Sequence, residues 1–167
     1  MADGLEHLVA VIQAAKAWRG RDMITATVDV TGAVPETFTV RARTPEGTIE
    51  ASSDHLRVTY HPATRERTVQ ERGHPPITEV LETFPMQPLV LGMFSPLDLP
   101  IWGGLEPNPS VVAATRDGGL VRLELAGLSS SGHAVVDLDT GIVVDLDYLG
   151  RRYTTRQVRQ VDALLAD

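Results

Sequence analysis

The sequence predicts a mainly β (α+β) protein: a curled antiparallel sheet or half-barrel with an N-terminal helix and short central helices. Three observations predict this fold. Short segments that alternate apolar and polar side chains recur on both sides of residues 75–109, as in half-buried strands. Tight turns separate these segments at short intervals, which favours an antiparallel meander. Residues 75–109 are dense in proline and large apolar side chains, so we expect an insert that plugs or gates the curled sheet.

The composition suits one soluble globular domain. The chain has 167 residues, of which 43% are hydrophobic and 22% are charged, and a chain of this length buries roughly two thirds of its unfolded surface. It holds no apolar run of 18 or more residues, so it predicts no membrane-spanning helix. The net charge of −7 repels phosphate backbones, which argues against nucleic acid as a partner. We therefore expect a single domain over residues 1–167.

Cysteine is absent, which excludes disulfides, thiolate metal sites and a cysteine nucleophile. The N-terminal stretch carries acidic residues ahead of its apolar part, where a secretory signal has Lys or Arg. As it stands, the sequence therefore predicts a cytoplasmic protein, or an exported one if a leader has been removed ahead of Met1. No glycine motif for nucleotide binding occurs, and the sequence predicts no cofactor.

An amphipathic helix is expected at about residues 4–18. Apolar side chains recur there at helical spacing and predict one buried stripe, made of Leu5, Leu8, Val9, Ile12 and Ala15. Trp18 extends the stripe, and we expect it to pack over the sheet. Gly20 follows as the helix stop.

The first meander of strands is expected at about residues 22–72. Apolar and polar positions alternate from Ile24 to Val30, from Phe38 to Ala42 and from Leu56 to Tyr60. A short strand from Thr48 to Ser52 lies between the last two. Residues 65–72 form a polar strand near an edge of the sheet.

The second meander is expected at about residues 110–161. Residues 111–115 and 120–126 predict one hairpin, and residues 135–138 and 142–148 predict another. Residues 152–161 alternate like a last strand, yet they could equally begin a terminal helix. Together the meanders give nine or ten strands. Their apolar sides should meet in one interior that includes Val28, Val40, Val58, Leu123 and Val144.

The insert, residues 75–109, is the candidate ligand-binding segment. Its repeated prolines prevent a long helix. Its large apolar side chains are suited to line a cavity or to form its lid, and methionine adapts to irregular apolar surfaces. The candidate residues are Leu81, Phe84, Met86, Leu89, Leu91, Met93, Phe94, Ile101 and Trp102. The alternative is that these side chains fill the core of a small barrel, since few other aromatic residues are available.

Four short phrases of the two meanders carry a resemblance to a known family. They are Ala26 to Val30, Phe38 to Gly47, Leu56 to Pro62 and Val136 to Val144. Together with the order of helix, meander, proline-broken middle and hairpins, they resemble the LolA-like superfamily. That group contains periplasmic lipoprotein carriers, mycobacterial lipoprotein relatives and the sensor domain of sigma-factor regulators. The pattern covers most of the chain.

The resemblance implies a half-open, strongly curved antiparallel sheet. It also implies that helices cover the concave face and enclose an apolar cavity for acyl chains. Members of the superfamily are exported, whereas this sequence shows no leader. The lipoprotein carriers use an arginine on an early strand. Arg41 and Arg43 lie in that neighbourhood, but neither can be aligned with it, so no role is transferred to them.

Charged groups are expected at the surface of the strands. Asp137, Asp139, Asp145 and Asp147 surround one hairpin turn, and their spacing departs from that of a calcium loop. Five arginines share solvent-facing parity on neighbouring strands, namely Arg41, Arg43, Arg57, Arg65 and Arg67. We expect them to pair across strands with Glu50, Glu66 and Glu71. The alternative is an arginine patch for an anionic headgroup or carboxylate.

Catalytic and metal-binding patterns are weak. His55 and His61 stand six positions apart on one strand, about 20 Å, which is too far for one metal ion. Ser129 to His133 place serines near a histidine, but no nucleophile elbow is present, and we expect a flexible loop there.

The sequence predicts a non-catalytic protein that binds or carries a hydrophobic or amphipathic, lipid-like ligand in an apolar cavity. One alternative is a small β-barrel enzyme that templates cyclisation or isomerisation of a hydrophobic intermediate. The other is an interaction domain that holds a transient protein partner through a sheet edge or the insert. A long apolar cavity favours the carrier, a small one with a desolvated titratable group favours the enzyme, and an exposed apolar patch favours the interaction domain.

Overall fold

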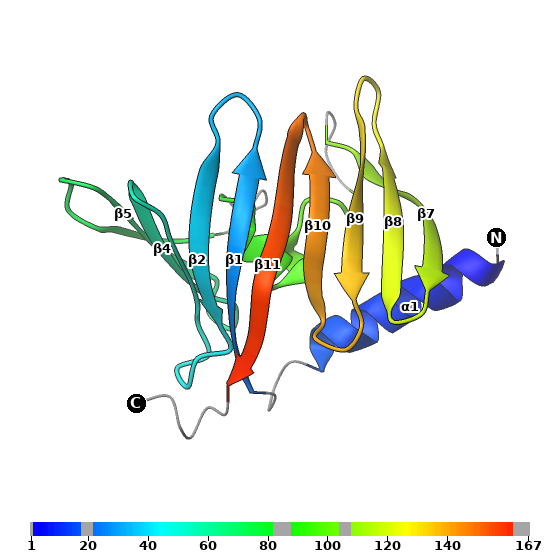
Figure 1. Cartoon of the computed structure of the whole chain (residues 1–167), viewed down its shortest axis with the longest axis horizontal. Coiled ribbons are helices and arrows are strands. Elements are labelled where there is room, and N and C mark those ends of the chain that lie inside the picture. Colours follow the sequence, from blue (N-terminus) through cyan, green and yellow to red (C-terminus); the bar gives the residue numbers. More distant parts are fainter. Residues whose placement is uncertain (1, 18–21, 82–87, 104–107, 162–167) are drawn as a thin grey trace.

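In the part of the chain that the structure describes, most residues belong to one antiparallel sheet of eleven strands (Figure 1). The computed structural model describes residues 2–17, 22–81, 88–103 and 108–161. The first six strands are β1 (Met23–Thr31), β2 (Glu36–Ala42), β3 (Ile49–Ser52), β4 (Leu56–His61), β5 (Glu66–Glu71) and β6 (Ile77–Val80). The other five are β7 (Ser110–Asp117), β8 (Leu120–Ala126), β9 (Ser131–Asp137), β10 (Ile142–Tyr148) and β11 (Arg151–Val161). Their spatial order is β6-β5-β4-β3-β2-β1-β11-β10-β9-β8-β7, so β1 and β11 pair in the middle.

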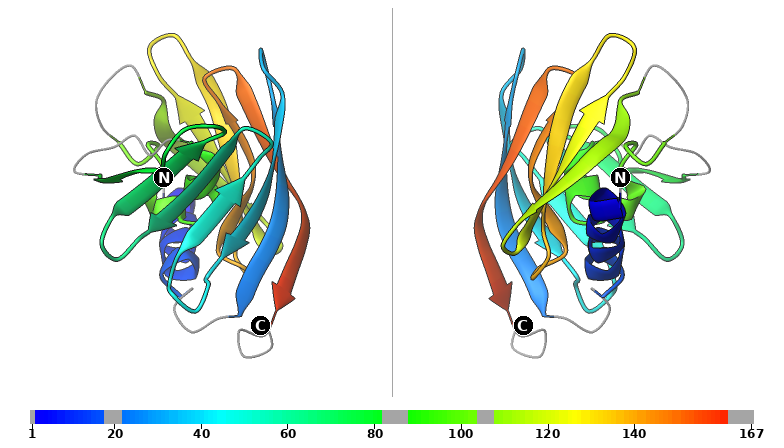
Figure 2. Two further views of the ribbon diagram at one scale, coloured as in Figure 1. Left: turned by 90° about the vertical axis from the view of Figure 1, so that its left-hand side faces the viewer. Right: turned by 90° about the vertical axis from the view of Figure 1, so that its right-hand side faces the viewer.

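The sheet is curved and open, as the views of Figure 2 show. Within the described residues, β6 and β7 form its two edges and do not pair with each other. The pairing register shifts between Thr25 and Thr27 of β1 and between Val111 and Ala113 of β7. Such bulges bend strands and increase their twist. The prediction of a mainly β protein with a curled antiparallel sheet is confirmed.

The predicted alternation places the apolar side of the strands in one interior. Val28, Val40, Val58 and Leu123 are fully buried members of a single core cluster. Val144 is half-buried and packs against that cluster. A bulge between Val143 and Asp145 explains the difference, because it turns Val143 into the core beside Val136 and leaves Val144 at its margin.

The polar strand β5 lies near an edge of the sheet, as predicted. The edge itself is β6, which pairs with β5 and was not predicted. Sequence reasoning missed β6, whose four residues belong to the segment that we assigned to the insert. At the other end of the chain, residues 152–161 are a strand, β11, and residues 162–167 lie outside the described residues.

The N-terminal helix, α1 (Ala2–Lys16), buries only part of the predicted stripe. Ala15 is buried as predicted, and Leu8 is half-buried against the core cluster. Leu5 is 65% exposed and Val9 is 44% exposed, so the prediction that both are buried was wrong, and Val11 and Ala14 are buried in their place. Small side chains let a helix backbone approach a sheet closely, which outweighs the larger apolar area of leucine at this contact. Trp18 and Gly20 lie outside the described residues.

Two short helical segments of the insert complete the core. They are α2 (Val90–Met93) and the 3₁₀ turn η1 (Pro96–Asp98). Both α1 and α2 lie on one side of the sheet (Figures 1 and 2). The core cluster joins residues from α1, both meanders and α2. The assignment of residues 1–167 to a single domain stays a prediction.

Candidate functional site

The insert runs between the two open edges of the sheet, from the end of β6 to the start of β7. Its helix α2 contacts β3 in the first meander and β10 in the second, while η1 contacts α1. The insert therefore packs between the two halves of the sheet and contacts both of them in the interior. It is the strongest candidate for a functional site.

The predicted ligand-binding residues gather in this interior. Five of them are at most 4% exposed and belong to the core cluster, namely Leu89, Leu91, Met93, Phe94 and Ile101. Leu81 and Trp102 are half-buried and pack against the same cluster. Phe84 and Met86 lie outside the described residues. The structure thus brings the seven described residues to one side of the sheet, and their contact with a ligand stays a prediction.

The backbone of the insert is held mainly by its own short-range hydrogen bonds. The amides of Leu91, Phe94 and Asp98 donate to carbonyls three residues earlier, at 2.8–3.2 Å. Within residues 88–103, one backbone hydrogen bond reaches a strand, from the amide of Val111 to the carbonyl of Ile101 at 2.9 Å. Side-chain packing, rather than a strand ladder, therefore fixes residues 88–103 against the sheet.

A polar cluster fastens η1 to β4. The hydroxyl of Tyr60, on β4, donates to Oδ2 of Asp98 at 3.3 Å, and the hydroxyl of Ser95 donates to the same oxygen at 2.6 Å. The indole N–H of Trp102 donates to the carbonyl of Pro96 at 2.7 Å. Burial and then the Asp98 carboxylate raise the pKa of Tyr60 to about 12, while the charge of Arg65 acts in the opposite direction. Tyr60 is therefore a protonated donor at neutral pH.

Sequence reasoning missed this cluster because it read Tyr60 only as an apolar strand position. One signal was available. Ser95 and Asp98 stand three residues apart at the start of a helical turn, which is the spacing of a capping box. Ser95 does occupy the N-cap of η1, but its hydroxyl bonds the Asp98 side chain.

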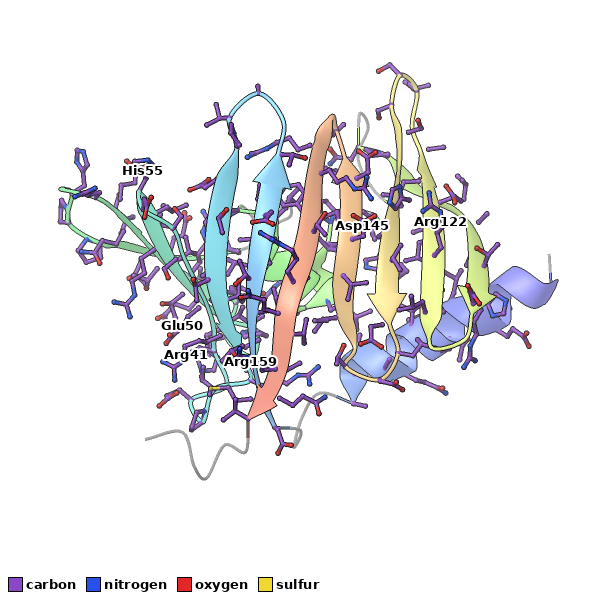
Figure 3. The ribbon with its side chains drawn as sticks, in the orientation of Figure 1. Arg41, Glu50, His55, Arg122, Asp145 and Arg159 are labelled. Atoms are coloured by element: carbon purple, nitrogen blue, oxygen red, sulfur yellow. The ribbon has the colours of Figure 1, made fainter. Side chains whose placement is uncertain are left out.

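A second polar cluster lies on the outer side of the sheet, around Asp145 of β10 (Figure 3). Its carboxylate is hydrogen-bonded to Nε2 of His133 at 2.6 Å and accepts two hydrogen bonds from Arg152, at 3.0 and 3.1 Å. The prediction that residues up to His133 form a loop was wrong, because β9 begins at Ser131 and places His133 beside β10. Partial burial raises the pKa of Asp145, but the bonds from Arg152 and His133 outweigh it and hold this pKa below its ordinary value.

Asp145→Asn should lower the free energy of unfolding at pH 7 by about 1–2 kcal/mol, since hydrogen bonds to a charged group contribute somewhat more than neutral ones. This loss is at the low end for hydrogen bonds to a charged group, because the Arg152 side chain is 59% exposed and solvent screens its charge. A carboxylate with a depressed folded pKa stabilises above the unfolded pKa of about 4 and loses this contribution as pH falls through the folded value. Urea titrations at pH 7 and pH 3 should show the difference between the parent and Asp145→Asn shrinking in acid. Asp147→Asn, on the same strand, is the control, and an equal loss in both variants would contradict the assignment.

The predicted arginine pairs are confirmed in part. Arg41 lies beside Glu50 at 3.7 Å (Figure 3), as predicted. Arg67 pairs with Glu79 of the unforeseen strand β6. Arg43 was expected to face solvent, and this was wrong: it is buried, and its guanidinium donates to the carbonyl of Thr140. The reason is that β2 ends at Ala42 and Arg43 adopts a left-handed conformation, with φ of 60°.

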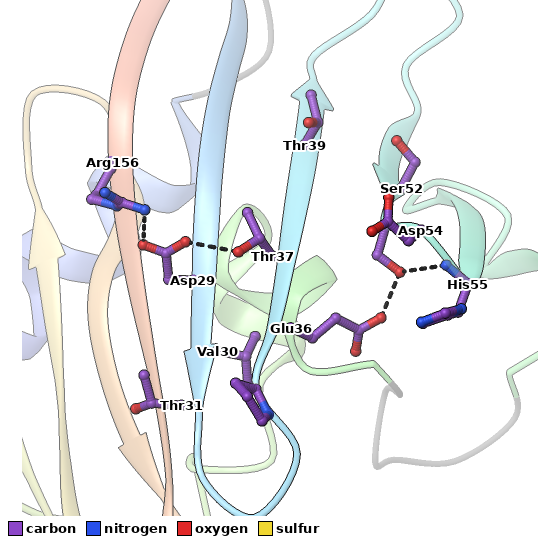
Figure 4. Close-up of a pocket in the computed structure, with 12 residues that line it drawn as sticks. Asp29, Val30, Thr31, Glu36, Thr37, Thr39, Ser52, Asp54, His55 and Arg156 are labelled. Carbon is purple, nitrogen blue, oxygen red and sulfur yellow. Dashed lines mark hydrogen bonds and ion pairs between the residues drawn. The ribbon is translucent and has the colours of Figure 1, made fainter.

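An open polar pocket of about 770 Å³ lies over β1, β2 and the turn after β3 (Figure 4). The carboxylate of Asp29 forms an ion pair with Arg156 and accepts a hydrogen bond from the hydroxyl of Thr37 at 3.0 Å. Glu36 accepts from the hydroxyl of Ser53. These contacts tie the lining groups to one another. Within the described residues, no three His, Asp or Glu side chains are placed to hold a metal ion.

No helix in the part of the chain that the structure describes is both long enough and apolar enough to cross a bilayer.

No protein-family model matches the sequence, and no curated protein matches it. Among solved structures, the fold is similar to MucB, with a TM-score of 0.47 and 16% identity over 98% of this chain. It is similar to the Pseudomonas aeruginosa MucA/MucB complex, with a TM-score of 0.46 and 15% identity over 95% of this chain. It is also similar to a LolA superfamily protein from Nitrosomonas europaea, with a TM-score of 0.43 and 9% identity, covering 93% of this chain and 94% of that one. The chain spans 60% and 58% of the first two.

Proposed function

We propose that this protein binds a hydrophobic or amphipathic, lipid-like ligand between the concave face of the sheet and the insert, which acts with α1 as a removable cover. One observation carries the proposal. The side chains of α2 and its neighbours occupy the interior, yet within residues 88–103 a single backbone hydrogen bond joins the insert to a strand. A cover held by apolar packing can be exchanged for another apolar group.

The exchange of the insert for a ligand is energetically feasible, because burial of the ligand's hydrocarbon replaces the burial of apolar side chains that the insert loses. Burying one Leu, Met or Phe side chain contributes about 1.5–3 kcal/mol, and each buried methylene contributes about 0.8 kcal/mol. An acyl chain of about twelve carbons would thus supply on the order of 10 kcal/mol. That matches the loss of several insert side chains from the core, such as Leu91 and Met93, both fully buried.

The parent protein should bind a fluorescent fatty-acid analogue saturably. Met93→Trp should weaken this binding, because the bulkier indole ring narrows the space beneath the insert, while the irregular backbone of the insert accommodates it without unfolding. Leu128→Trp adds the same ring at a position that is exposed in the β8–β9 turn, and its binding should equal that of the parent. Fluorescence titration and thermal melting of all three proteins give the comparison.

Hydrogen exchange supplies the second half of this test. The amides of Leu91, Phe94 and Asp98 bond only within the insert, so they should exchange faster than those of β1 and β10. Two results together would overturn the proposal: no saturable binding of any apolar analogue, and insert amides that exchange as slowly as the strands. The insert would then be permanent core.

An interaction domain is the second candidate, and the edge strand β6 favours it. Ile77 and Val80 of this strand are 67% and 61% exposed. An extended peptide can add a strand to an open edge and bury such side chains. Ile77→Lys should leave binding of the fatty-acid analogue unchanged, whereas it would abolish strand addition at this edge.

A further inference from the structure

We propose that the ligand is an anionic amphiphile, whose carboxylate or phosphate takes the place of Asp98 beside Tyr60 and Arg65 when the insert lifts. Asp98 is then an internal mimic of the ligand's head, and it keeps the empty site closed. This inference rests on the proposed function and deepens it by naming the chemical class of the ligand.

The polar groups of this cluster come from two different parts of the molecule. Tyr60 belongs to β4, whereas Ser95 and Asp98 belong to the insert. Lifting the insert removes the carboxylate and leaves the hydroxyl on the sheet. Tyr60 is only 2% exposed. Its cross-strand neighbours are the fully buried Ile49 on β3 and, on β5, Arg67, which pairs with Glu79. A donor left in such a buried place without an acceptor carries a desolvation penalty. A ligand that supplies an acceptor there therefore binds better than a plain hydrocarbon.

The acceptor that suits this place is negatively charged. Tyr60 already donates to a carboxylate at this place, Oδ2 of Asp98 at 3.3 Å, and the charge of Arg65 acts on the same hydroxyl. Hydrogen bonds to a charged acceptor are stronger than those to a neutral one. Arg65 also lies beside the end of β6, since its carbonyl accepts the amide of Leu81 at 2.9 Å. An anionic oxygen at this place would accept the hydrogen bond of Tyr60 and would be attracted by the charge of Arg65.

The ligand and Asp98 compete for the same hydroxyl. A ligand anion and the Asp98 carboxylate cannot share one hydroxyl without like-charge repulsion. Binding of the anion and closure of the insert on Tyr60 are therefore mutually exclusive. Neutralising Asp98 should therefore raise the affinity for an anionic ligand. Removing the hydroxyl of Tyr60, which both anions would use, should abolish the preference for an anion.

The test is displacement of a fluorescent fatty-acid analogue by three twelve-carbon chains: dodecanoate, dodecyl phosphate and dodecanol. The parent should bind the two anions about tenfold more tightly than the alcohol, which corresponds to about 1.4 kcal/mol. Tyr60→Phe should bring all three to the affinity of the alcohol. Asp98→Asn should raise the affinity for both anions. The anion that binds more tightly identifies the head as carboxylate or phosphate.

Tyr148→Phe is the matched control. Tyr148 is also a buried tyrosine on a strand, and within the described residues its hydroxyl has no hydrogen-bond partner. This variant should keep the parent's preference for anions. Equal binding of the three chains by the parent would overturn this inference while keeping the proposed function. A uniform loss in Tyr60→Phe for all chains would also overturn it, since Tyr60 would then act only in packing. Binding of none of the chains would overturn the proposed function itself.

Discussion

Gly132→Ala should destabilise the protein more than any other glycine-to-alanine substitution in this sheet. A Cβ at this position would lie 2.1 Å from the carbonyl oxygen of Asp147 and 3.0 Å from its carbon. Both atoms are backbone atoms of β10, which pairs with β9 at this point, so neither can rotate away. The strands must separate, and β8 and β7 lie beyond them. We expect the free energy of unfolding to fall by about 3 kcal/mol or more.

Gly119→Ala is the control for this experiment. The nearest atom to a Cβ at Gly119 is a side-chain oxygen of Asp139, at 3.7 Å, which is an ordinary contact. Its stability should stay within about 0.5 kcal/mol of the parent. Urea denaturation followed by circular dichroism measures both variants. If Gly132→Ala unfolds at the same urea concentration as Gly119→Ala, the close approach of β9 and β10 is wrong.

Gly141→Ala should detach α1 from the sheet. Gly141 has φ of +69°, and its Cβ would lie 2.4 Å from the carbonyl oxygen of Ala14, near the end of α1. Two costs combine here. A left-handed conformation costs a non-glycine residue about 1–2 kcal/mol, and the helix must move away from the β9–β10 turn. We expect a total loss of about 3 kcal/mol, with part of the buried stripe of α1 exposed.

Gly150→Ala separates the two costs. Gly150 has φ of +76°, and its Cβ would meet no atom within 4 Å. It therefore reports the backbone conformation alone, and the difference between the two variants measures the contact with α1. Denaturation should show the larger loss for Gly141→Ala, and hydrogen exchange should show faster exchange in α1 for that variant only. Equal losses would mean that the helix does not press on the turn.

The sequence predicted the strands well because one face of most of them is buried. From Ile24 to Val30 the apolar positions are all buried, and period-two alternation records such a face directly. It could not place β6, all of whose residues are exposed, because a strand without a buried face has no such pattern. It also could not foresee the bulge at Val143, which shifts the parity of a strand by one residue.

The sequence predicted the apolar residues of the candidate site but not its polar cluster. Leu91 and Met93 stand out in sequence by type, and both are buried. The bond between Tyr60 and Asp98 joins positions 38 residues apart, and no local spacing encodes it. The predicted stripe of α1 was wrong at Leu5 and Val9 for a related reason. Hydrophobicity ranks Leu5 above Ala14, whereas the distance between helix and sheet decides which of them is buried.

The pairing of β1 with β11 has a consequence for how the chain folds. Among the strands of the described residues, nine of the ten neighbouring pairs join strands that are consecutive in sequence, and β1 with β11 is the exception. It brings Met23 opposite Val161, 138 positions away. Hairpins close short loops and form early, whereas a contact of such sequence separation must wait until both ends are already ordered. The seam between the two meanders should thus be the rate-limiting event. Substitutions along it would slow folding, and substitutions in the outer hairpins would mainly speed unfolding.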